Sequence, residues 1–266
     1  YKDLRDNDPV HCMKDFGGFE HNLQSLRVVD LLEQRYVNFD GLNLTFETRE
    51  GILKHCSTKN AKNLGAIGER FIKKQQPSLE AQLVNYADEI AYNIHDIDDG
   101  YRSGVIKFNS LMEVSLFKEC ADLVKKDYPN IDEIRWLHET IRKMTFSLIF
   151  DICERSSINL KKYKPKTIDD IRKLPNLINF SENMKKKQSE LKKFLRHFLY
   201  EHERVVEMTN NAKEIIKDLF LYFMNNPSLM PEFYKNKSSH DLSRAVADYL
   251  AGMTDRYAIK THKDIS

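Results

Sequence analysis

Two carboxylates and a phenol follow one another at intervals of four residues in the segment from Leu79 to Ile97. If this segment is helical, Asp88, Tyr92 and Asp96 lie along one face of the helix with a slow angular drift. Desolvating a carboxylate is costly unless a cation or hydrogen bonds compensate, so an inward-facing stripe of this kind predicts a metal or ligand site. On an exposed face the same spacing would be unremarkable, and the residue types alone leave both interpretations open.

A second group of polar residues stands at the start of a predicted helix, in the sequence GGFEHNLQSLR. His21 and Asn22 open this helix, and the N–H groups and dipole of a helix N-terminus favour an anion such as phosphate. An N-cap followed by a solvated histidine is the alternative interpretation. Lys54 lies near the end of the next predicted helix, where it could neutralise phosphate charge or simply complement the helix C-terminus.

The elements that must position these residues are predicted to be helices. Apolar residues recur with helical period in nearly every segment, and 9 Gly and 7 Pro are too few for a many-turned β-architecture. The helix with the carboxylates should begin after Ser78 as its N-cap and end at Asp98-Asp99-Gly100, with Gly100 in the left-handed conformation. A short helix is predicted to follow Thr45 as its N-cap and to run through Leu53, and a long helix over residues 131–154 is predicted to start at Asn130 or Asp132. Other helices are predicted over residues 20–36, 111–126, 168–173, 181–200, 205–225 and 239–257.

Aromatic residues indicate where these helices pack. Trp136 and the phenylalanines within 146–150 and 194–198 are predicted to be core residues. The C-terminal run DYLAGMTDRYA has an Ala-Gly centre that permits close helix packing, so we expect a structural role for Asp248. The fold class is therefore all-α, and the connected apolar faces suggest one compact unit.

The charge balance excludes a strong general attraction to nucleic acid or membrane, because the chain has 42 basic and 40 acidic residues. Basic residues do cluster in Lys161–Lys166 and Lys185–Lys193, which are either solvated helix faces or a local polyanion site. The 4 cysteines form no CxxC pair and are typical of reduced thiols in the cytoplasm. No apolar run is long enough to span a bilayer.

Five stretches together resemble the deoxyguanosinetriphosphate triphosphohydrolase (dGTPase) family of the HD-domain phosphohydrolase superfamily in order and spacing. They are GGFEHNLQSLRVV, GLNLTFETREGILKH, SLEAQLVNYADEIAYNIHDIDDG, LYEHERVV…NNPSLMP and DYLAGMTDRYA. The resemblance implies an HD-domain-type helical bundle with additional C-terminal helices. Residues 1–110 would form the C-terminal portion of the HD catalytic domain, and residues 111–266 a helical C-terminal region packed as one unit with it.

The resemblance also implies roles for the carboxylate stripe. The family's metal site uses a His, an adjacent His-Asp pair and a distant Asp, and Asp88 would be that distant Asp. The ion would be Mg or Mn, with Fe, Ni or Zn as alternatives in a crystal. Tyr92 would pack against C2′ of the sugar, where a 2′-hydroxyl would meet the ring, and Asp96 would accept a hydrogen bond from the 3′-hydroxyl.

The same resemblance places three further residues at the triphosphate. Asn22, together with His21 as a catalytic group, would face the phosphates, and Lys54 would neutralise part of their charge. The sequence departs from the family's pattern of metal ligands in one serious respect. In that pattern the adjacent His-Asp pair comes before the distant Asp, but the first such pair in this sequence, His95-Asp96, follows Asp88 on the same predicted helix. We therefore expect the missing ligands in a segment ahead of residue 1, and we expect the chain by itself to hold the metal poorly and to be inactive.

The implied function is metal-dependent hydrolysis of a deoxynucleoside triphosphate to a deoxynucleoside and inorganic triphosphate. The resemblance favours dGTP as the substrate. The resemblance also implies a homo-oligomer, and the basic segments are candidates for a regulatory dNTP or single-stranded DNA. Two alternatives stay open: an HD phosphohydrolase for another nucleotide, and a non-catalytic HD-like module that binds nucleotides or single-stranded DNA. The sequence identifies no residue that would recognise the base of the nucleotide.

Overall fold

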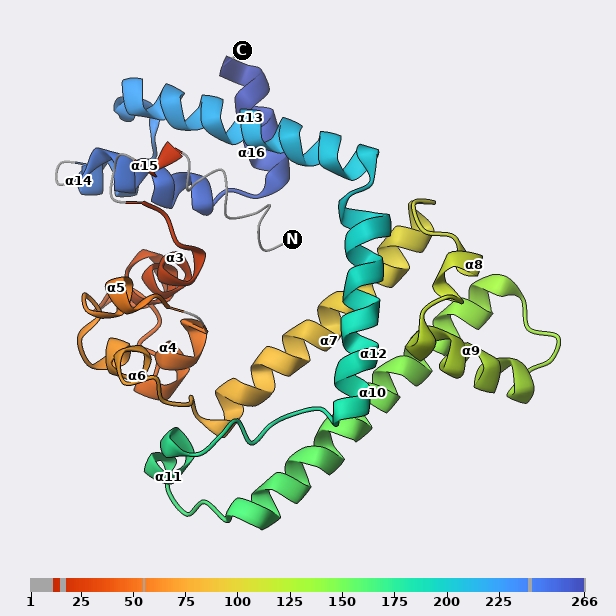
Figure 1. Cartoon of the computed structure of the whole chain (residues 1–266). Coiled ribbons are helices and arrows are strands. Elements are labelled where there is room, and N and C mark those ends of the chain that lie inside the picture. The colour runs from red at the N-terminus through yellow and green to blue at the C-terminus, as the bar shows by residue number, and fades with distance from the viewer. Residues whose placement is uncertain (1–11, 15–17, 55, 239–240, 266) are drawn as a thin grey trace. The chain divides into compact units, whose positions relative to one another are not determined.

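The computed structural model describes residues 12–14, 18–54, 56–238 and 241–265, and the regular elements in this part of the chain are helices (Figure 1). The predicted all-α fold is confirmed. The one β-type pairing within the same residues is an isolated bridge between Gln34 and Gly41. None of the described helices is both long and apolar enough to cross a bilayer.

The chain divides into two compact units. The first unit comprises Tyr1–Cys56 and Arg204–Ser266, and the second comprises Ser57–Glu203. The division expected at residue 110 falls inside the second unit, and the assignment of residues 1–110 and 111–266 to two regions packed as one unit stays a prediction.

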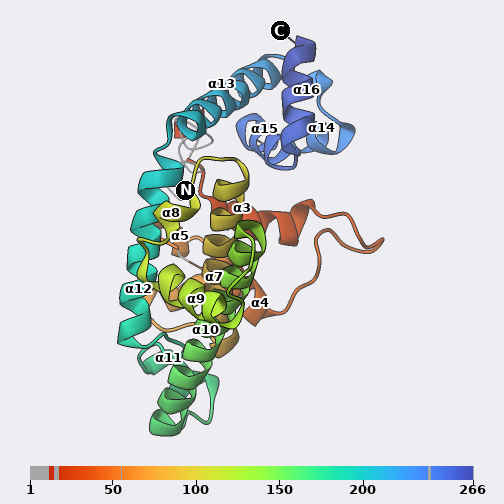
Figure 2. The same ribbon diagram turned by 90° about the vertical axis from the view of Figure 1, so that its right-hand side faces the viewer.

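Helices from both ends of the chain build the first unit. They are α3 (His21–Arg27), the π-helical turn η2 (Val28–Leu32), α4 (Phe46–Ile52), α13 (Glu203–Asn225), the short turn η5 (Pro227–Leu229), α14 (Glu232–Ser238), α15 (Leu242–Ala251) and α16 (Asp255–Ile265). Helix α14 packs along α15, and α16 contacts α13, where His262 lies 2.9 Å from Asp218 (Figure 2). The single helix predicted over residues 239–257 is therefore two helices, broken after Ala251.

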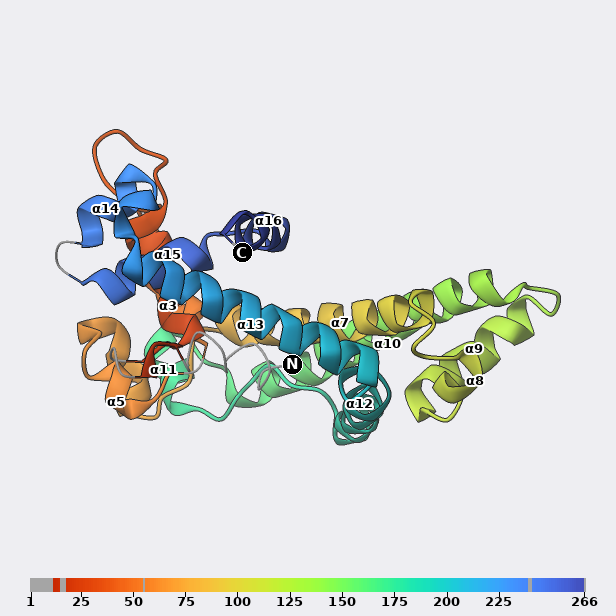
Figure 3. The same ribbon diagram turned by 90° about the horizontal axis from the view of Figure 1, so that it is seen from above.

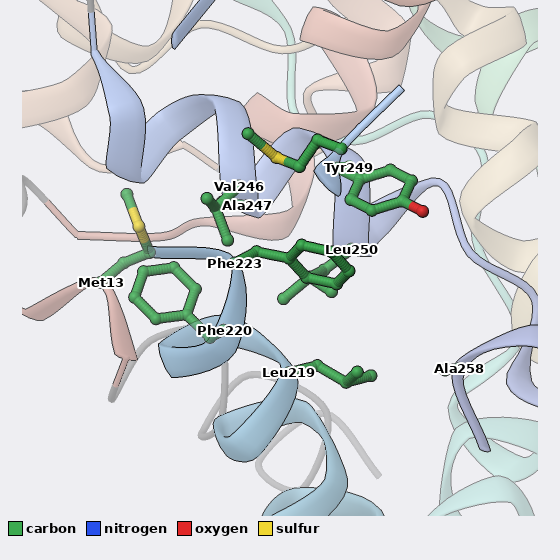
Figure 4. Close-up of a cluster of buried hydrophobic side chains, with 10 residues drawn as sticks. Met13, Leu219, Phe220, Phe223, Val246, Ala247, Tyr249, Leu250 and Ala258 are labelled. Carbon is green, nitrogen blue, oxygen red and sulfur yellow. The ribbon is translucent and has the colours of Figure 1, made fainter. Parts of the chain in front are cut away.

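The core of the first unit lies between α13 and α15 (Figure 4). Phe220 and Phe223 of α13 pack against Val246 and Leu250 of α15, and all four side chains are buried. Phe223 also meets Tyr249 edge to face, with 5.1 Å between the ring centroids. Each such buried side chain contributes about 1.5–3 kcal/mol, so this cluster is what joins the C-terminal helices into one body.

The second unit is built around three long helices. Its elements are α5 (Thr58–Ala61), η3 (Gly65–Gly68), α6 (Glu69–Ile72), α7 (Leu79–Arg102), α8 (Phe108–Leu111), α9 (Ser115–Asp127), α10 (Glu133–Tyr163), α11 (Ile168–Lys173), α12 (Glu182–Leu195) and the π-helical turn η4 (Arg196–Tyr200). Helix α10 packs against both α7 and α9, and α12 contacts the same two helices (Figure 3).

The long helix α10 buries one face and exposes the other. Met144, Leu148 and Ile152 are buried at four-residue spacing. The prediction that Phe146 and Phe150 belong to the core is wrong, because these side chains are 68% and 57% exposed. The reason is the helical period: both residues lie on the side of α10 opposite to the buried face.

The start of α7 was predicted correctly and its end was not. Ser78 is the N-cap, and its hydroxyl accepts from the N–H of Ala81. The helix does not end at Gly100 but continues to Arg102, and Gly100 is a buried helical residue. A Cβ at Gly100 would lie 2.6 Å from Cδ1 of Ile106, so close packing explains this glycine.

Candidate active site

A cluster of two tyrosines and one aspartate forms where α7 meets η4, within the second unit. The Tyr200 hydroxyl donates to Oδ2 of Asp96, and it is also hydrogen-bonded to Tyr92, one turn earlier on α7. Burial, reinforced by the bond to Asp96, raises the pKa of the Tyr200 phenol well above its usual value. The phenol therefore stays protonated at neutral pH and serves as a permanent donor to the carboxylate.

Contacts between α7 and α12 hold this cluster in place. Nδ2 of Asn93 donates to Oε1 of Gln188 over 3.1 Å in the buried interface, and Nζ of Lys192 lies 2.6 Å from Oε1 of Glu89. Helix α12 then widens into the π-helical turn η4, which ends at Tyr200. Turns of this kind redirect side chains and are frequent at functional sites. The arrangement presents an oriented carboxylate beside an aromatic ring, which suits recognition of a hydroxyl on a small ring.

Asp88 lies two turns before Asp96 on α7 and is exposed on the second unit. No three His, Cys, Asp or Glu side chains of the described residues come together as a metal-binding group. One carboxylate is too few ligands for a tight divalent site. The described residues thus do not fit a complete metal centre, and the role of Asp88 as one ligand stays a prediction.

The N-terminus of α3 is occupied by a carboxylate from the chain itself. Glu20 is the N-cap, and its side chain accepts from the backbone N–H groups of Asn22 and Leu23 at 3.0 and 2.9 Å. Nδ2 of Asn22 donates to the same carboxylate at 3.0 Å, and Nδ1 of His21 lies 3.5 Å from it. An anion at this helix end would have to displace or share these donors with Glu20, so the roles of His21 and Asn22 at phosphate stay predictions.

Lys54 directly follows the C-terminus of α4 and adopts a left-handed backbone conformation, with φ of +35°. Its N–H donates to the carbonyl of Gly51 at 3.2 Å, and its side chain is half-buried. Helix α4 is attached to η2 by two bonds from Arg49 to Asp30, at 2.7 and 2.6 Å. These contacts hold the backbone at Lys54 in place. The contact of its side chain with a triphosphate stays a prediction.

A buried ion pair fixes α3 on α15. Asp248 is 1% exposed, and its carboxylate accepts from Nε and Nη2 of Arg27, each at 2.8 Å. Nε2 of Gln24 donates to Oδ1 of Asp248 at 2.9 Å. The expected structural role of Asp248 thus has a physical basis, but its partners on α3 were not predicted from the sequence.

The structure brings some of the predicted site residues together. Tyr92 and Asp96 meet in the cluster, and Asp88 lies on the same helix. The other three predicted residues belong to the first unit: His21, Asn22 and Lys54. The functional roles of all six residues stay predictions.

Tyr200 is the candidate functional residue that sequence reasoning missed. Its signal was present, because it lies in the LYEHERVV stretch that carried part of the resemblance.

Comparison with known proteins adds two findings. Residues 178–264 match the family model described as "Phosphohydrolase-associated domain". The chain is 52% identical over 256 residues to the deoxyguanosinetriphosphate triphosphohydrolase-like protein of Bordetella pertussis, which covers 95% of this chain and 67% of the relative. It is 51% identical over 254 residues to the protein of the same description from Thiobacillus denitrificans, covering 96% of this chain and 68% of the relative.

Proposed function

Because this chain belongs to the deoxyguanosinetriphosphate triphosphohydrolase-like family, we propose that it takes part in hydrolysing a deoxynucleoside triphosphate to a deoxynucleoside and inorganic triphosphate. The observation that carries the proposal is the cluster of Tyr92, Asp96 and Tyr200. The description of the relatives makes dGTP the first substrate to test.

The cluster supports a role in recognising the sugar. The carboxylate of Asp96 would accept a hydrogen bond from the 3′-hydroxyl, and Tyr200 fixes the plane of that carboxylate by donating to Oδ2. The ring of Tyr92 would pack against C2′, where a ribonucleotide carries an additional hydroxyl. Such a site would disfavour a ribonucleotide because the extra hydroxyl clashes with the ring and loses its hydration. The two effects together are worth about 1–3 kcal/mol, or roughly a 10–200-fold preference for the deoxyribonucleotide in kcat/KM.

Three further residues would bind the triphosphate. Lys54 would neutralise part of the charge, while His21 and Asn22 would stabilise charge that develops on the phosphates. The Mg or Mn ion expected for the family would take Asp88 as one ligand. Since the described residues do not form a complete metal centre, no catalytic step is assigned to the ion.

Several broader expectations accompany this proposal. We propose a cytoplasmic protein that forms a homo-oligomer. A regulatory dNTP or single-stranded DNA would bind near Lys161–Lys166 and Lys185–Lys193, where basic residues cluster. These expectations derive from the resemblance and from the sequence.

The test of the sugar-recognition role compares kcat/KM for dGTP and GTP in the catalytically active protein. Tyr92→Ala should reduce the preference for dGTP by about tenfold or more, because the ring no longer opposes the 2′-hydroxyl. Tyr200→Phe should lower kcat/KM for both substrates and leave the ratio nearly unchanged. An unchanged dGTP-to-GTP ratio in Tyr92→Ala would refute the role of Tyr92.

A non-catalytic nucleotide-binding module is the second candidate function. Such a module would bind dGTP and release no product. Tyr92→Ala would reduce its preference for dGTP over GTP, measured as a ratio of binding affinities. Product analysis therefore separates the two functions.

A further inference from the structure

Two buried amide side chains face each other in the interface between α7 and α12. Asn93 is 5% exposed and Gln188 is 3% exposed, and Nδ2 of Asn93 donates to Oε1 of Gln188 at 3.1 Å. Nε2 of Gln188 is buried as well, and it has no hydrogen-bond partner in the part of the chain that the structure describes. A buried donor without a partner lowers stability, whereas an apolar side chain of the same shape would not. Stability therefore does not explain the amide at position 188.

The bond between these amides combines burial with direction. Apolar side chains of α12 are buried too, but apolar contacts have no preferred direction and allow small rotations of one helix on the other. The ion pair of Glu89 with Lys192 is directional, but its side chains are 30% and 48% exposed, so it contributes little. The bond of Asn93 to Gln188 is thus well suited to fix the angle at which α12 crosses α7.

Gln188 and Tyr200 project from the same side of the helix that α12 and η4 form. A continuous α-helix turns by about 100° per residue, which would place position 200 about 120° around the axis from position 188. The π-helical turn η4 takes up one additional residue. Tyr200 therefore lies within about 20° of the direction of Gln188. Both side chains reach α7, where the Tyr200 hydroxyl donates to Asp96.

The length of helix between the two contacts makes the second contact sensitive to the crossing angle. Gln188 and Tyr200 are about 17 Å apart along the axis, at about 1.5 Å per residue. A change of about 5° in the crossing angle at Gln188 would move Tyr200 by about 1.4 Å. A shift of this size would break the bond from the Tyr200 hydroxyl to Asp96, because hydrogen bonds between oxygen atoms need a separation of about 2.5–3.0 Å.

We propose that Gln188 is a positioning residue for recognition of the 3′-hydroxyl of the sugar. Its bond to Asn93 sets the crossing angle of α12, the crossing angle places Tyr200, and Tyr200 orients the carboxylate of Asp96. The unpaired Nε2 of Gln188 is the loss of stability that accompanies this arrangement. The inference rests on the proposed function for the role of Asp96 at the sugar, but the coupling of Gln188 to Tyr200 can be tested without a substrate.

Urea unfolding of the 266-residue chain, followed by the fluorescence of Trp136 in the same unit, tests this coupling. The apolar pair Asn93→Leu/Gln188→Met removes the bond and the unpaired donor together at nearly constant volume, so it should fold. In the wild type, Tyr200→Phe should raise the ratio of unfolded to folded protein by about fivefold or more, because a bond to a carboxylate is lost. In the apolar pair that bond is already broken, and Tyr200→Phe should change the ratio by less than about twofold.

The exchanged pair Asn93→Gln/Gln188→Asn is the matched control. It keeps both amides and the summed length of the two side chains, so the bond between α7 and α12 should re-form. Tyr200→Phe should then raise the unfolded fraction by about fivefold or more, as in the wild type.

A nucleotide without a 3′-hydroxyl separates positioning from a general distortion of the site. In the catalytically active protein, the apolar pair should lower kcat/KM for dGTP by about fivefold or more, and adding Tyr200→Phe should lower it no further. The inhibition constant of 2′,3′-dideoxy-GTP should stay within about twofold of the wild-type value, because this nucleotide has no 3′-hydroxyl for Asp96 to bind. A general distortion would weaken the binding of both nucleotides.

Two results would each overturn the proposal. The first is an effect of Tyr200→Phe on unfolding that is equal in the wild type and in the apolar pair, because Gln188 would then have no influence on Tyr200. The second is a loss for 2′,3′-dideoxy-GTP as large as the loss for dGTP. Coupling in urea without any hydrolysis of dGTP would contradict the proposed function and still confirm that Gln188 positions Tyr200.

Discussion

Replacing Asp248 by asparagine removes the charge from the buried pair that joins α3 to α15. The substitution preserves the volume of the side chain, so it creates no cavity. It leaves Arg27 with its two donors pointing at a neutral amide, and Arg27 is 30% exposed. Gln24 also loses a charged acceptor in a buried position. We therefore expect Asp248→Asn to lower the free energy of unfolding of the first unit.

The magnitude follows from burial. Removing one partner of a buried ion pair costs about 3–5 kcal/mol because the other charge is left uncompensated. Partial solvation of Arg27 reduces this figure, so we expect a loss of about 2–3 kcal/mol, or roughly 30–150-fold in the unfolding equilibrium. Asp218→Asn is the matched control in the same unit, because Asp218 pairs with His262 and is 52% exposed. It should cost less than about 1 kcal/mol.

Urea unfolding measured by two probes separates the units. The 1 tryptophan of the chain, Trp136, belongs to the second unit, so its fluorescence reports on that unit. Far-UV circular dichroism reports on both units. We expect Asp248→Asn to move part of the dichroism transition to lower urea while the fluorescence midpoint stays in place. An Asp248→Asn variant as stable as Asp218→Asn would refute the role given to the buried pair.

Two further predictions concern stability. Gly41→Ala should destabilise the chain by more than about 2 kcal/mol, because φ is +77° and a Cβ would lie 2.4 Å from the carbonyl oxygen of Asp30; Gly104→Ala has a similar φ of +73° with open space around it and should cost only about 1 kcal/mol. Denaturant titration of both variants would contradict this reasoning if the two costs were equal. Above pH 10 the unfolded state should release the Tyr200 proton while the folded state retains it, since burial and Asp96 raise the pKa of Tyr200, so stability should fall by up to about 1.4 kcal/mol per pH unit from this group. In Tyr200→Phe the alkaline loss should be smaller by that amount, and identical pH profiles of unfolding for the two proteins would exclude the effect.

Local signals predicted the helices well. Ser78 and Thr45 were identified as helix starts, and Asp132 was one of two candidates for a third. The side chain of each accepts a bond from a backbone N–H in the first turn of its helix. The range of α11 was also predicted correctly. Capping depends on residues three or four positions apart, so the sequence contains the whole signal.

Features that depend on distant contacts could not be read in the same way. Gly100 resembles a helix terminator, yet its role is set by Ile106 after the chain turns. Phe146 and Phe150 resemble core residues because hydrophobicity does not reveal which face of α10 is covered. Tyr200 lies 104 positions from Asp96 along the chain, so only the packing of α12 on α7 shows their contact.

The site shows the same division. The spacing of Asp88, Tyr92 and Asp96 placed them on one face of a helix, and the structure confirms that helix. The sequence could not show that Glu20 occupies the N-terminus of α3, because a carboxylate before a helix is equally consistent with a solvated side chain. The cluster at Tyr200 therefore carries more weight in the proposed function than the helix end at His21.

Product analysis of dGTP hydrolysis tests the central claim most directly. Anion-exchange chromatography would follow dGTP incubated with Mn²⁺ and the 266-residue chain, in parallel with a version extended to the full length of its relatives. The account predicts deoxyguanosine and inorganic triphosphate from the extended version. Release of orthophosphate or pyrophosphate instead, or no hydrolysis by either version, would contradict it.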